Sequence, residues 1–304
     1  MLKTKENKVT IEGIVSEVDF RDGSFMRDGS PINSFGGTVK VRVTQKINGV
    51  DTELEIPVHA FAAQRKRDGN ANPIYESLKK YVEDTKSAAV VGLEEADRVR
   101  ITGATIDMNE YYGQNGQLIT FPRISSSFFR KINKNECNPE ATFSVIMTIG
   151  KAAEEVDREG VPTGRYKIQG IIPRYNGEID IIPFIADNPG VIDTVSQCWN
   201  EGDTVKATGK LNFTSKTVTE TVEQDFGEPL TKTRTISVSE LVINGGLSTP
   251  LDGELAYDIN EVKEAIAART VRLEQLKAKQ EARASKPKTT PSSSINAHAL
   301  DLGF

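Results

Sequence analysis

The chain contains an internal repeat. The segment from Asp97 to Gly103 (DRVRITG) recurs from Asp203 to Gly209 (DTVKATG). Each copy alternates β-branched with polar residues and ends in glycine, which is typical of a strand followed by a bend or bulge. With 304 residues, the chain is long enough for about two domains. The repeat therefore predicts two similar modules, each built around such a strand.

Both modules carry the same hairpin signature upstream of the repeated strand. Asn48-Gly49 separates two alternating segments in the first module, and Asn176-Gly177 does so in the second. Asn-Gly between alternating segments is a strong hairpin signal, because both residues tolerate positive φ. One helix is predicted between the hairpin and the repeated strand of each module. The start signal is Asn-Pro in residues 72–82 and Asn-Pro-Gly in residues 187–199.

The order of the expected elements indicates a fold. An opening strand (Val9–Val18 and Ala141–Ile149) and a closing strand (Ile119–Ile132 and Thr233–Ile243) complete each module. Five strands with a helix between the third and the fourth is the connectivity of the OB-fold. The sequence thus predicts a mainly β chain of two tandem five-stranded OB-like Greek-key barrels, followed by a C-terminal α-helix and a flexible tail. Another small barrel or a sandwich is the alternative.

Four segments follow from this organisation. Residues 1–135 form the first OB-like module, which carries a helical insertion, and residues 136–247 form the second. Residues 248–284 hold a long helix with an interrupted apolar stripe. Residues 285–304 combine a Ser- and Pro-rich linker with an apolar, acidic tip.

Composition excludes several classes of function. Two cysteines and two histidines, His59 and His298, are too few for a disulfide framework or a His-rich metal site. The chain has no Walker A or G-x-G-x-x-G motif, so we expect no cofactor, no metal and no enzyme activity. It also has no long apolar run and no secretory signal, so we expect a cytoplasmic protein, in the host cytoplasm if it is viral, without a membrane partner.

The net charge of −5 is unevenly distributed. Residues 1–135 carry 20 Lys and Arg against 18 Asp and Glu, whereas residues 136–247 carry 10 against 17. The first module is therefore the better candidate for binding a polyanion.

Basic and aromatic residues alternate along the expected strands and loops of the first module. Flat rings beside cations suit single-stranded nucleic acid, whose bases stack on the rings while Lys and Arg neutralise the phosphates. The alternatives are ordinary solvated strand faces for the cations and barrel packing for Phe20 and Phe35. The candidate nucleic-acid-binding residues are Phe20, Phe35, Lys40, Arg42, Arg65, Lys66, Arg67, Arg98, Arg100, Tyr111, Tyr112, Arg174 and Tyr175.

Two OB-like modules, a Ser/Pro linker and a tip that ends in Phe304 resemble single-stranded DNA-binding proteins, especially those of bacteriophage replication. The resemblance implies a chain that coats single-stranded DNA without sequence preference during replication or recombination. It also implies a tail that recruits replication or recombination proteins through Asp301, Leu302 and Phe304. This tip holds a single acid, Asp301, where bacterial members of that group have an acidic run.

Other functions stay open at this point. The chain could be a structural or assembly protein, such as a virion component, whose barrels are interaction modules and whose long helix forms a homo-oligomer. An enzyme with a carboxylate site is a third hypothesis, although Glu178 and Asp180 have no basic partner at nuclease spacing.

Overall fold

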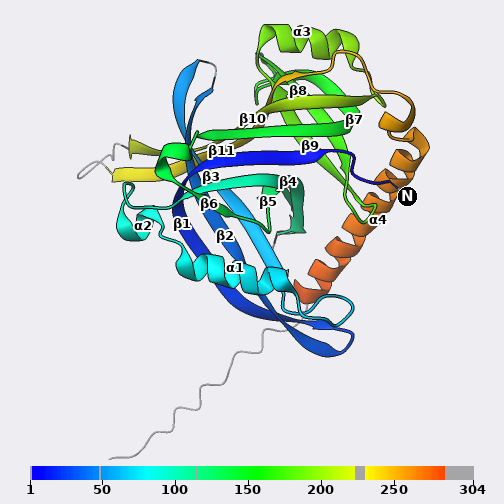
Figure 1. The fold of residues 1–304 in the computed structure, drawn as a ribbon. Helices are drawn as coiled ribbons and strands as arrows, with labels where there is room; N and C mark the ends of the chain where they lie inside the picture. Colours follow the sequence, from blue (N-terminus) through cyan, green and yellow to red (C-terminus); the bar gives the residue numbers. More distant parts are fainter. Residues whose placement is uncertain (1, 48, 114, 223–229, 285–304) are drawn as a thin grey trace, which may run out of the picture.

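The computed structural model describes residues 2–47, 49–113, 115–222 and 230–284. Its strands join one 11-stranded sheet, and helices lie at the periphery (Figure 1). Ten of these strands form two barrels. The elements outside the barrels are the short strand β6 (Arg130–Ile132) and the helices α1 (Pro73–Asp84), α2 (Ala88–Val91), η1 (Lys134–Glu136), α3 (Pro189–Cys198), η2 (Gly253–Leu255) and α4 (Ile259–Ala284).

The first barrel consists of β1 (Asn7–Arg27), β2 (Ser30–Ile47), β3 (Val50–Ala63), β4 (Arg98–Tyr112) and β5 (Leu118–Ser125). β1 pairs with β2 and β4, β2 with β3, and β4 with β5, all antiparallel. A parallel contact between β3 and β5 closes the ring. With α1 between β3 and β4, this is the OB-fold that the sequence predicts.

The second barrel repeats this arrangement. It consists of β7 (Glu140–Val156), β8 (Pro162–Pro173), β9 (Ile179–Ala186), β10 (Thr204–Val222) and β11 (Leu230–Gly246). β7 pairs with β8 and β10, and a parallel bridge between β9 and β11 closes the ring. α3 lies between β9 and β10, as α1 lies between β3 and β4. The repeated segments fall on β4 and β10, which confirms the prediction of two equivalent strands.

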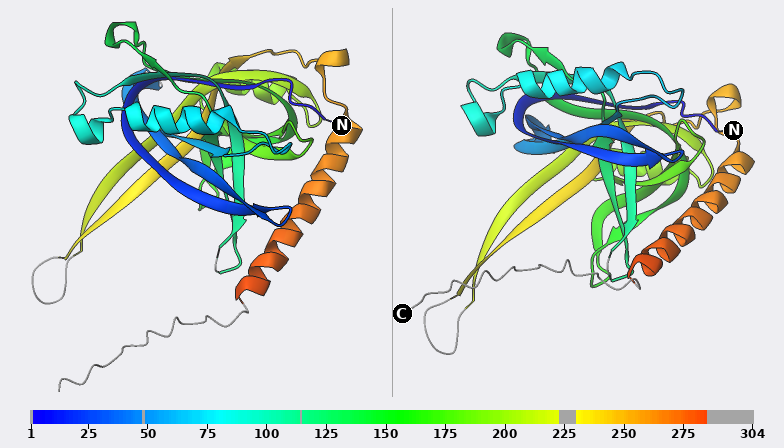
Figure 2. Two further views of the ribbon diagram at one scale, coloured as in Figure 1. Left: turned by 60° about the horizontal axis from the view of Figure 1, so that its bottom comes forward. Right: turned by 90° about the horizontal axis from the view of Figure 1, so that it is seen from below.

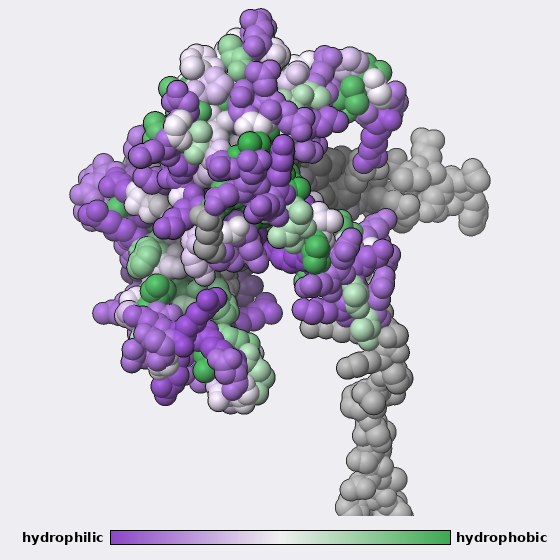
Figure 3. Space-filling model, turned by 90° about the vertical axis from the view of Figure 1, so that its right-hand side faces the viewer, coloured by the Kyte–Doolittle hydropathy of each residue, from purple (hydrophilic) through white to green (hydrophobic). Residues whose placement is uncertain are grey.

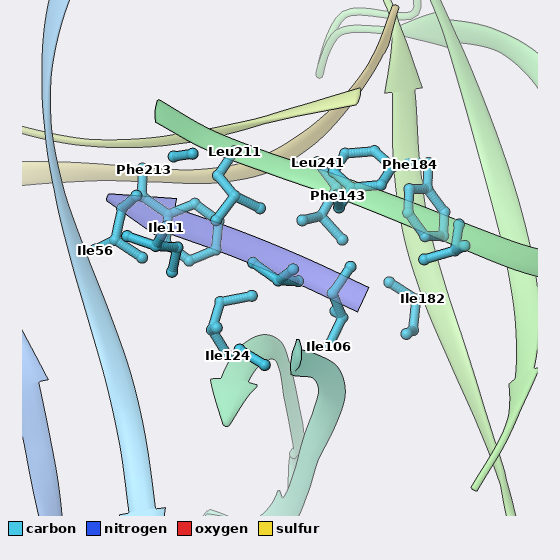
Figure 4. Packing of buried hydrophobic residues seen from close by; sticks show 14 of the residues in the cluster. Ile11, Ile56, Ile106, Ile124, Phe143, Ile182, Phe184, Leu211, Phe213 and Leu241 are labelled. Carbon is cyan, nitrogen blue, oxygen red and sulfur yellow. The ribbon is translucent and has the colours of Figure 1, made fainter. Parts of the chain in front are cut away.

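The two barrels are fused rather than strung on a linker. Residues Val9–Glu12 of β1 pair with β4 on one side and with β7 on the other. A single cluster of buried residues accordingly runs from Ile56 and Ile124 of the first barrel to Phe143 and Phe184 of the second (Figure 4). The barrels therefore share both a strand and a core.

The closing strand of the first barrel differs from the expectation of one strand over residues 119–132. β5 ends at Ser125 and β6 begins at Arg130. The Ser126 hydroxyl accepts a hydrogen bond from the Phe128 backbone N–H at 3.2 Å and donates one to the Phe128 carbonyl at 3.0 Å. Such a local side-chain turn competes with the sheet ladder, so the strand is interrupted here.

A long C-terminal helix is confirmed. α4 runs down the side of the body, with Tyr257 and Val262 near its start buried against Ile146 and Ile179 of the second barrel (Figure 2). No helix in the described part of the chain combines the length and the apolar character that crossing a membrane requires.

The two repeated glycines serve different purposes. Gly103 has φ +85°, and its Cβ position is open, so it supplies a left-handed bend. At Gly209 an added Cβ would overlap the Val242 carbonyl oxygen and the Phe143 ring, so close packing requires glycine there. One repeated residue thus meets two separate physical demands.

We therefore expect Gly209→Ala to destabilise the protein by about 1–3 kcal/mol or more, because the core must shift to accept the methyl group. Gly103→Ala should cost about 1 kcal/mol through backbone strain alone. Urea denaturation of both variants measures the difference. Equal losses of unfolding free energy in the two variants would contradict the assignment of close packing to Gly209 and of a left-handed bend to Gly103.

Candidate nucleic-acid interface

A groove of about 900 Å³ crosses the outer surface of the first barrel. All five strands of that barrel contribute to it, together with the loop after β5. Gly36 and Gly37 of β2 leave part of its wall without side chains, and Arg123 of β5 contributes a cation. The groove therefore draws on every strand of the barrel, and its lining holds two arginines, Arg21 and Arg123, and two acids, Asp22 and Asp107.

Aromatic rings from three separate segments face this groove. Phe61 of β3, Phe128 of the loop after β5 and Tyr175 of the β8–β9 turn line it. They are 61%, 68% and 83% exposed, although large aromatic rings normally bury most of their surface. Phe61 pairs with Gly36 across the β2–β3 ladder, where an added Cβ would approach its ring to 3.0 Å. Because Gly36 has no side chain, the Phe61 ring can lie over it at the surface.

Tyr175 belongs to the second barrel but lines the groove of the first. Its turn is held by the preceding residue, Arg174, whose guanidinium binds Asp180 at 2.5 and 2.7 Å and donates to the Met108 carbonyl of β4 at 3.1 Å. The site is therefore a composite of both barrels.

One end of the groove leads to a basic turn. The Phe25 and Phe61 rings lie 6.2 Å apart, and the Arg27 guanidinium lies 5.2 Å from the Phe25 ring. Arg27 also donates to the carbonyls of Arg65 and Lys66 at 3.1 and 3.0 Å. Rings and cations thus continue beyond Phe61 to the exposed turn of residues 65–67, which suits a strand that stacks its bases and neutralises its phosphates.

Arg123 is one of two arginines that line the groove, the other being Arg21. Its Nε is buried and makes no hydrogen bond to any part of the chain that the structure describes. An unsatisfied buried guanidinium nitrogen carries a desolvation cost. A phosphate in the groove would accept hydrogen bonds from the accessible part of the guanidinium and not from the buried Nε.

His59 lies beside Arg123 in the groove. Burial of the imidazole, together with the nearby Arg123 charge, lowers the pKa of His59 below its ordinary value. Its Nδ1 lies 3.2 Å from the Thr38 hydroxyl. His59 is therefore neutral at pH 7, and Arg123 supplies the positive charge at this point of the groove.

This shift predicts a pH dependence of stability. Because the folded state binds the His59 proton less tightly than the unfolded state, acidification favours unfolding once the pH falls below the unfolded pKa of about 6.5. We expect the free energy of unfolding to fall between pH 6.5 and pH 5, and His59→Asn to flatten that part of the profile. A variant profile parallel to that of the wild type would contradict this expectation.

Several candidate cations are already paired within the protein. Lys40 binds Glu17 at 2.6 Å, and Arg100 binds Glu12 at 2.5 Å. The hydrogen bond that Arg100 donates lowers the pKa of Glu12, and the one that Lys40 donates to the Glu17 carboxylate raises the pKa of Lys40. Arg42 lies 3.7 Å from Glu53. These residues lie outside the lining of the groove, and a DNA phosphate would have to compete with their carboxylate partners.

Phe20, Phe35 and Arg98 were expected to contact nucleic acid, but their side chains pack or bond inside the protein. Phe35 is 8% exposed and packs with Phe20 under α1, so the alternative of internal packing holds for both rings. Arg98 is also 8% exposed and donates to the Ala96 and Glu94 carbonyls. Alternation along a strand predicts outward cations, but the chain folds back over Arg98.

The remaining candidates lie at the edges or outside the described residues. Tyr111 is partly exposed on the β4–β5 hairpin, with its ring edge-on to Phe121 at 6.4 Å, and Tyr112 follows it. Neither tyrosine is among the residues that line the groove, although other residues of β4 and β5 are. Asp301, Leu302 and Phe304 lie outside the residues that the structure describes.

Sequence reasoning missed Phe61, Phe128 and Arg123. Phe61 was open to prediction, because Leu54, Ile56, Val58, Ala60 and Ala62 alternate as inward residues of β3 and leave Phe61 facing outward. Phe128 gives no comparable signal, because its exposure depends on the interruption between β5 and β6.

On the side of α4, the surface is mostly hydrophilic with small apolar patches (Figure 3).

Comparisons with known proteins identify a matching family and similar solved structures. The model of the YorF family matches residues 5–279. No curated protein matches the chain. A deletion mutant of the single-stranded DNA binding protein from Thermus aquaticus is similar over 81% of this chain and 95% of its own, with 9% identity and a TM-score of 0.46. The wild-type form of that protein is similar over 83% and 96%, with 8% identity and a TM-score of 0.46.

Proposed function

We propose that this chain, which belongs to the YorF family, binds single-stranded DNA without sequence preference and coats it during replication or recombination. In this proposal the protein is not an enzyme. The bases stack on exposed rings, and Arg and Lys neutralise the phosphates.

The groove of the first barrel is the observation that supports this function best. Phe61, Phe128 and Tyr175 come from separate segments, yet they line one groove with Arg123, whose buried Nε has no hydrogen-bond partner among the described residues. Exposed ring faces cost solvation free energy unless a ligand covers them, and unstacked bases are flat apolar ligands of matching shape. Duplex DNA hides its base faces and cannot use these rings.

Fluorescence anisotropy of labelled oligo-dT, compared with a duplex of equal length at two salt concentrations, tests the proposal. We expect tight binding to oligo-dT and weaker binding to the duplex. The logarithm of the affinity should fall with the logarithm of the salt concentration by about 0.7 per neutralised phosphate. Absence of oligo-dT binding at low salt would refute the proposal and favour an assembly role.

A further inference from the structure

An ion network links both barrels to α4 beside the groove. Glu110 of β4, whose side chain is 2% exposed, accepts hydrogen bonds from Arg269 and Arg272 of α4. The distance from Arg272 Nη2 to Glu110 Oε2 is 2.7 Å. Arg272 Nη1 also lies 3.6 Å from Glu178 Oε2 in the β8–β9 turn of the second barrel. Arg272 therefore contacts the first barrel and the second barrel at once.

The same turn has a second tie to the first barrel. Arg174 binds Asp180 through two hydrogen bonds and the Met108 carbonyl through a third. Met108 and Glu110 belong to one strand, β4. Arg174 and Glu178, which flank residues 175–177, are thus both anchored, whereas Tyr175 is 83% exposed.

An exposed ring on an isolated turn would lose conformational freedom when a base stacks on it, and that loss weakens binding. Anchoring the turn before DNA arrives reduces the loss. Arg174 and Arg272 are suited to this purpose, because a guanidinium holds carboxylates and carbonyls in a fixed planar geometry. Their side chains are 26% and 27% exposed and are directed to protein acceptors.

We propose that Arg272, together with Arg174, is a positioning residue that holds Tyr175 in the groove of the first barrel, an inference that rests on the proposed function. α4 then acts on the DNA site without touching DNA. It fixes the second barrel against β4, so that a ring of one barrel completes the binding surface of the other.

A double-mutant cycle tests this inference. Oligo-dT affinity is measured by anisotropy for the wild type, Arg272→Ala, Tyr175→Ala and the double variant, each at several salt concentrations. Lys279→Ala removes the same charge from an exposed position of α4 and is the matched control. Urea denaturation and circular dichroism of each variant measure its fold.

We expect Arg272→Ala to weaken oligo-dT binding about three- to tenfold. Without Arg272, DNA binding must itself order the turn and the Tyr175 side chain, and the entropy lost in that ordering corresponds to a change in affinity of about this size. In the Tyr175→Ala background the same change should alter affinity less than about twofold, because the ring that Arg272 positions is already absent. The salt dependence should remain that of the wild type, and Lys279→Ala should bind like the wild type. If Arg272→Ala does not fold, Arg272→Lys, which keeps the charge but loses the planar fork, replaces it in the cycle.

Three results would overturn the inference while leaving the proposed function intact. Unchanged affinity of Arg272→Ala, with Tyr175→Ala weakened, would show that the network does not act on the ring. A salt slope reduced by about 0.7 would show that Arg272 binds a phosphate itself. Additive losses in the double variant would show an effect independent of Tyr175. If the wild type fails to bind oligo-dT, the proposed function fails and this inference with it.

Discussion

The double variant Phe61→Ala, Phe128→Ala is expected to bind oligo-dT at least about thirtyfold more weakly than the wild type. Each base stacked on an aromatic ring contributes about 1–3 kcal/mol, and tenfold in affinity corresponds to about 1.4 kcal/mol. The two rings come from different segments, so they are expected to stack different bases. Because both are more than half exposed, their removal leaves the barrel core intact.

Anisotropy titration measures this loss, with circular dichroism to establish the fold. Val90→Ala is the control, because Val90 is 81% exposed on α2 and lies outside the groove. It should bind like the wild type. An affinity of the double variant within about twofold of the wild type would contradict the placement of DNA in this groove.

Glu110→Ala is expected to lower the free energy of unfolding by about 3–5 kcal/mol. The substitution leaves Arg269 and Arg272 without the buried carboxylate that they share, and removing one partner of a buried ion network has a cost of this size. Urea denaturation measures the change.

Glu17→Ala provides the comparison, because the Glu17 side chain is 47% exposed and pairs with Lys40 at the surface. Such a pair contributes about 1 kcal/mol or less. If both variants lose the same stability, the Glu110 network has no special part in joining the barrels to α4.

The architecture was open to prediction because it depends on local patterns. Alternating β-branched residues, Asn-Gly pairs and Asn-Pro helix starts each act within a few residues, and their order alone indicates two OB-folds. The extra pairing of β1 with β7 was not predictable, because nothing in the alternation of residues 9–12 indicates that the strand has neighbours on both edges. The fusion of the two barrels thus depends on contacts between distant segments.

The candidate site was predicted less completely, for the same reason. The sequence predicts Tyr175 as a nucleic-acid contact, and the residue lines the groove, but its place beside the first barrel depends on the bond between Arg174 and Met108, which lie 66 residues apart. Lys40, Arg42 and Arg100 have the composition of a binding face, yet each has an acidic partner from another strand or turn segment. Composition identifies cations, whereas only the fold shows which of them retain free hydrogen-bonding capacity.

Photo-crosslinking of 4-thiothymidine oligonucleotides, followed by mass spectrometry, tests the central claim most directly. A strand in the groove of the first barrel should crosslink to peptides that contain Phe61, Phe128 and Tyr175, and unlabelled oligo-dT should abolish these crosslinks. Crosslinks confined to other surfaces, with these three peptides unmodified, would contradict the account.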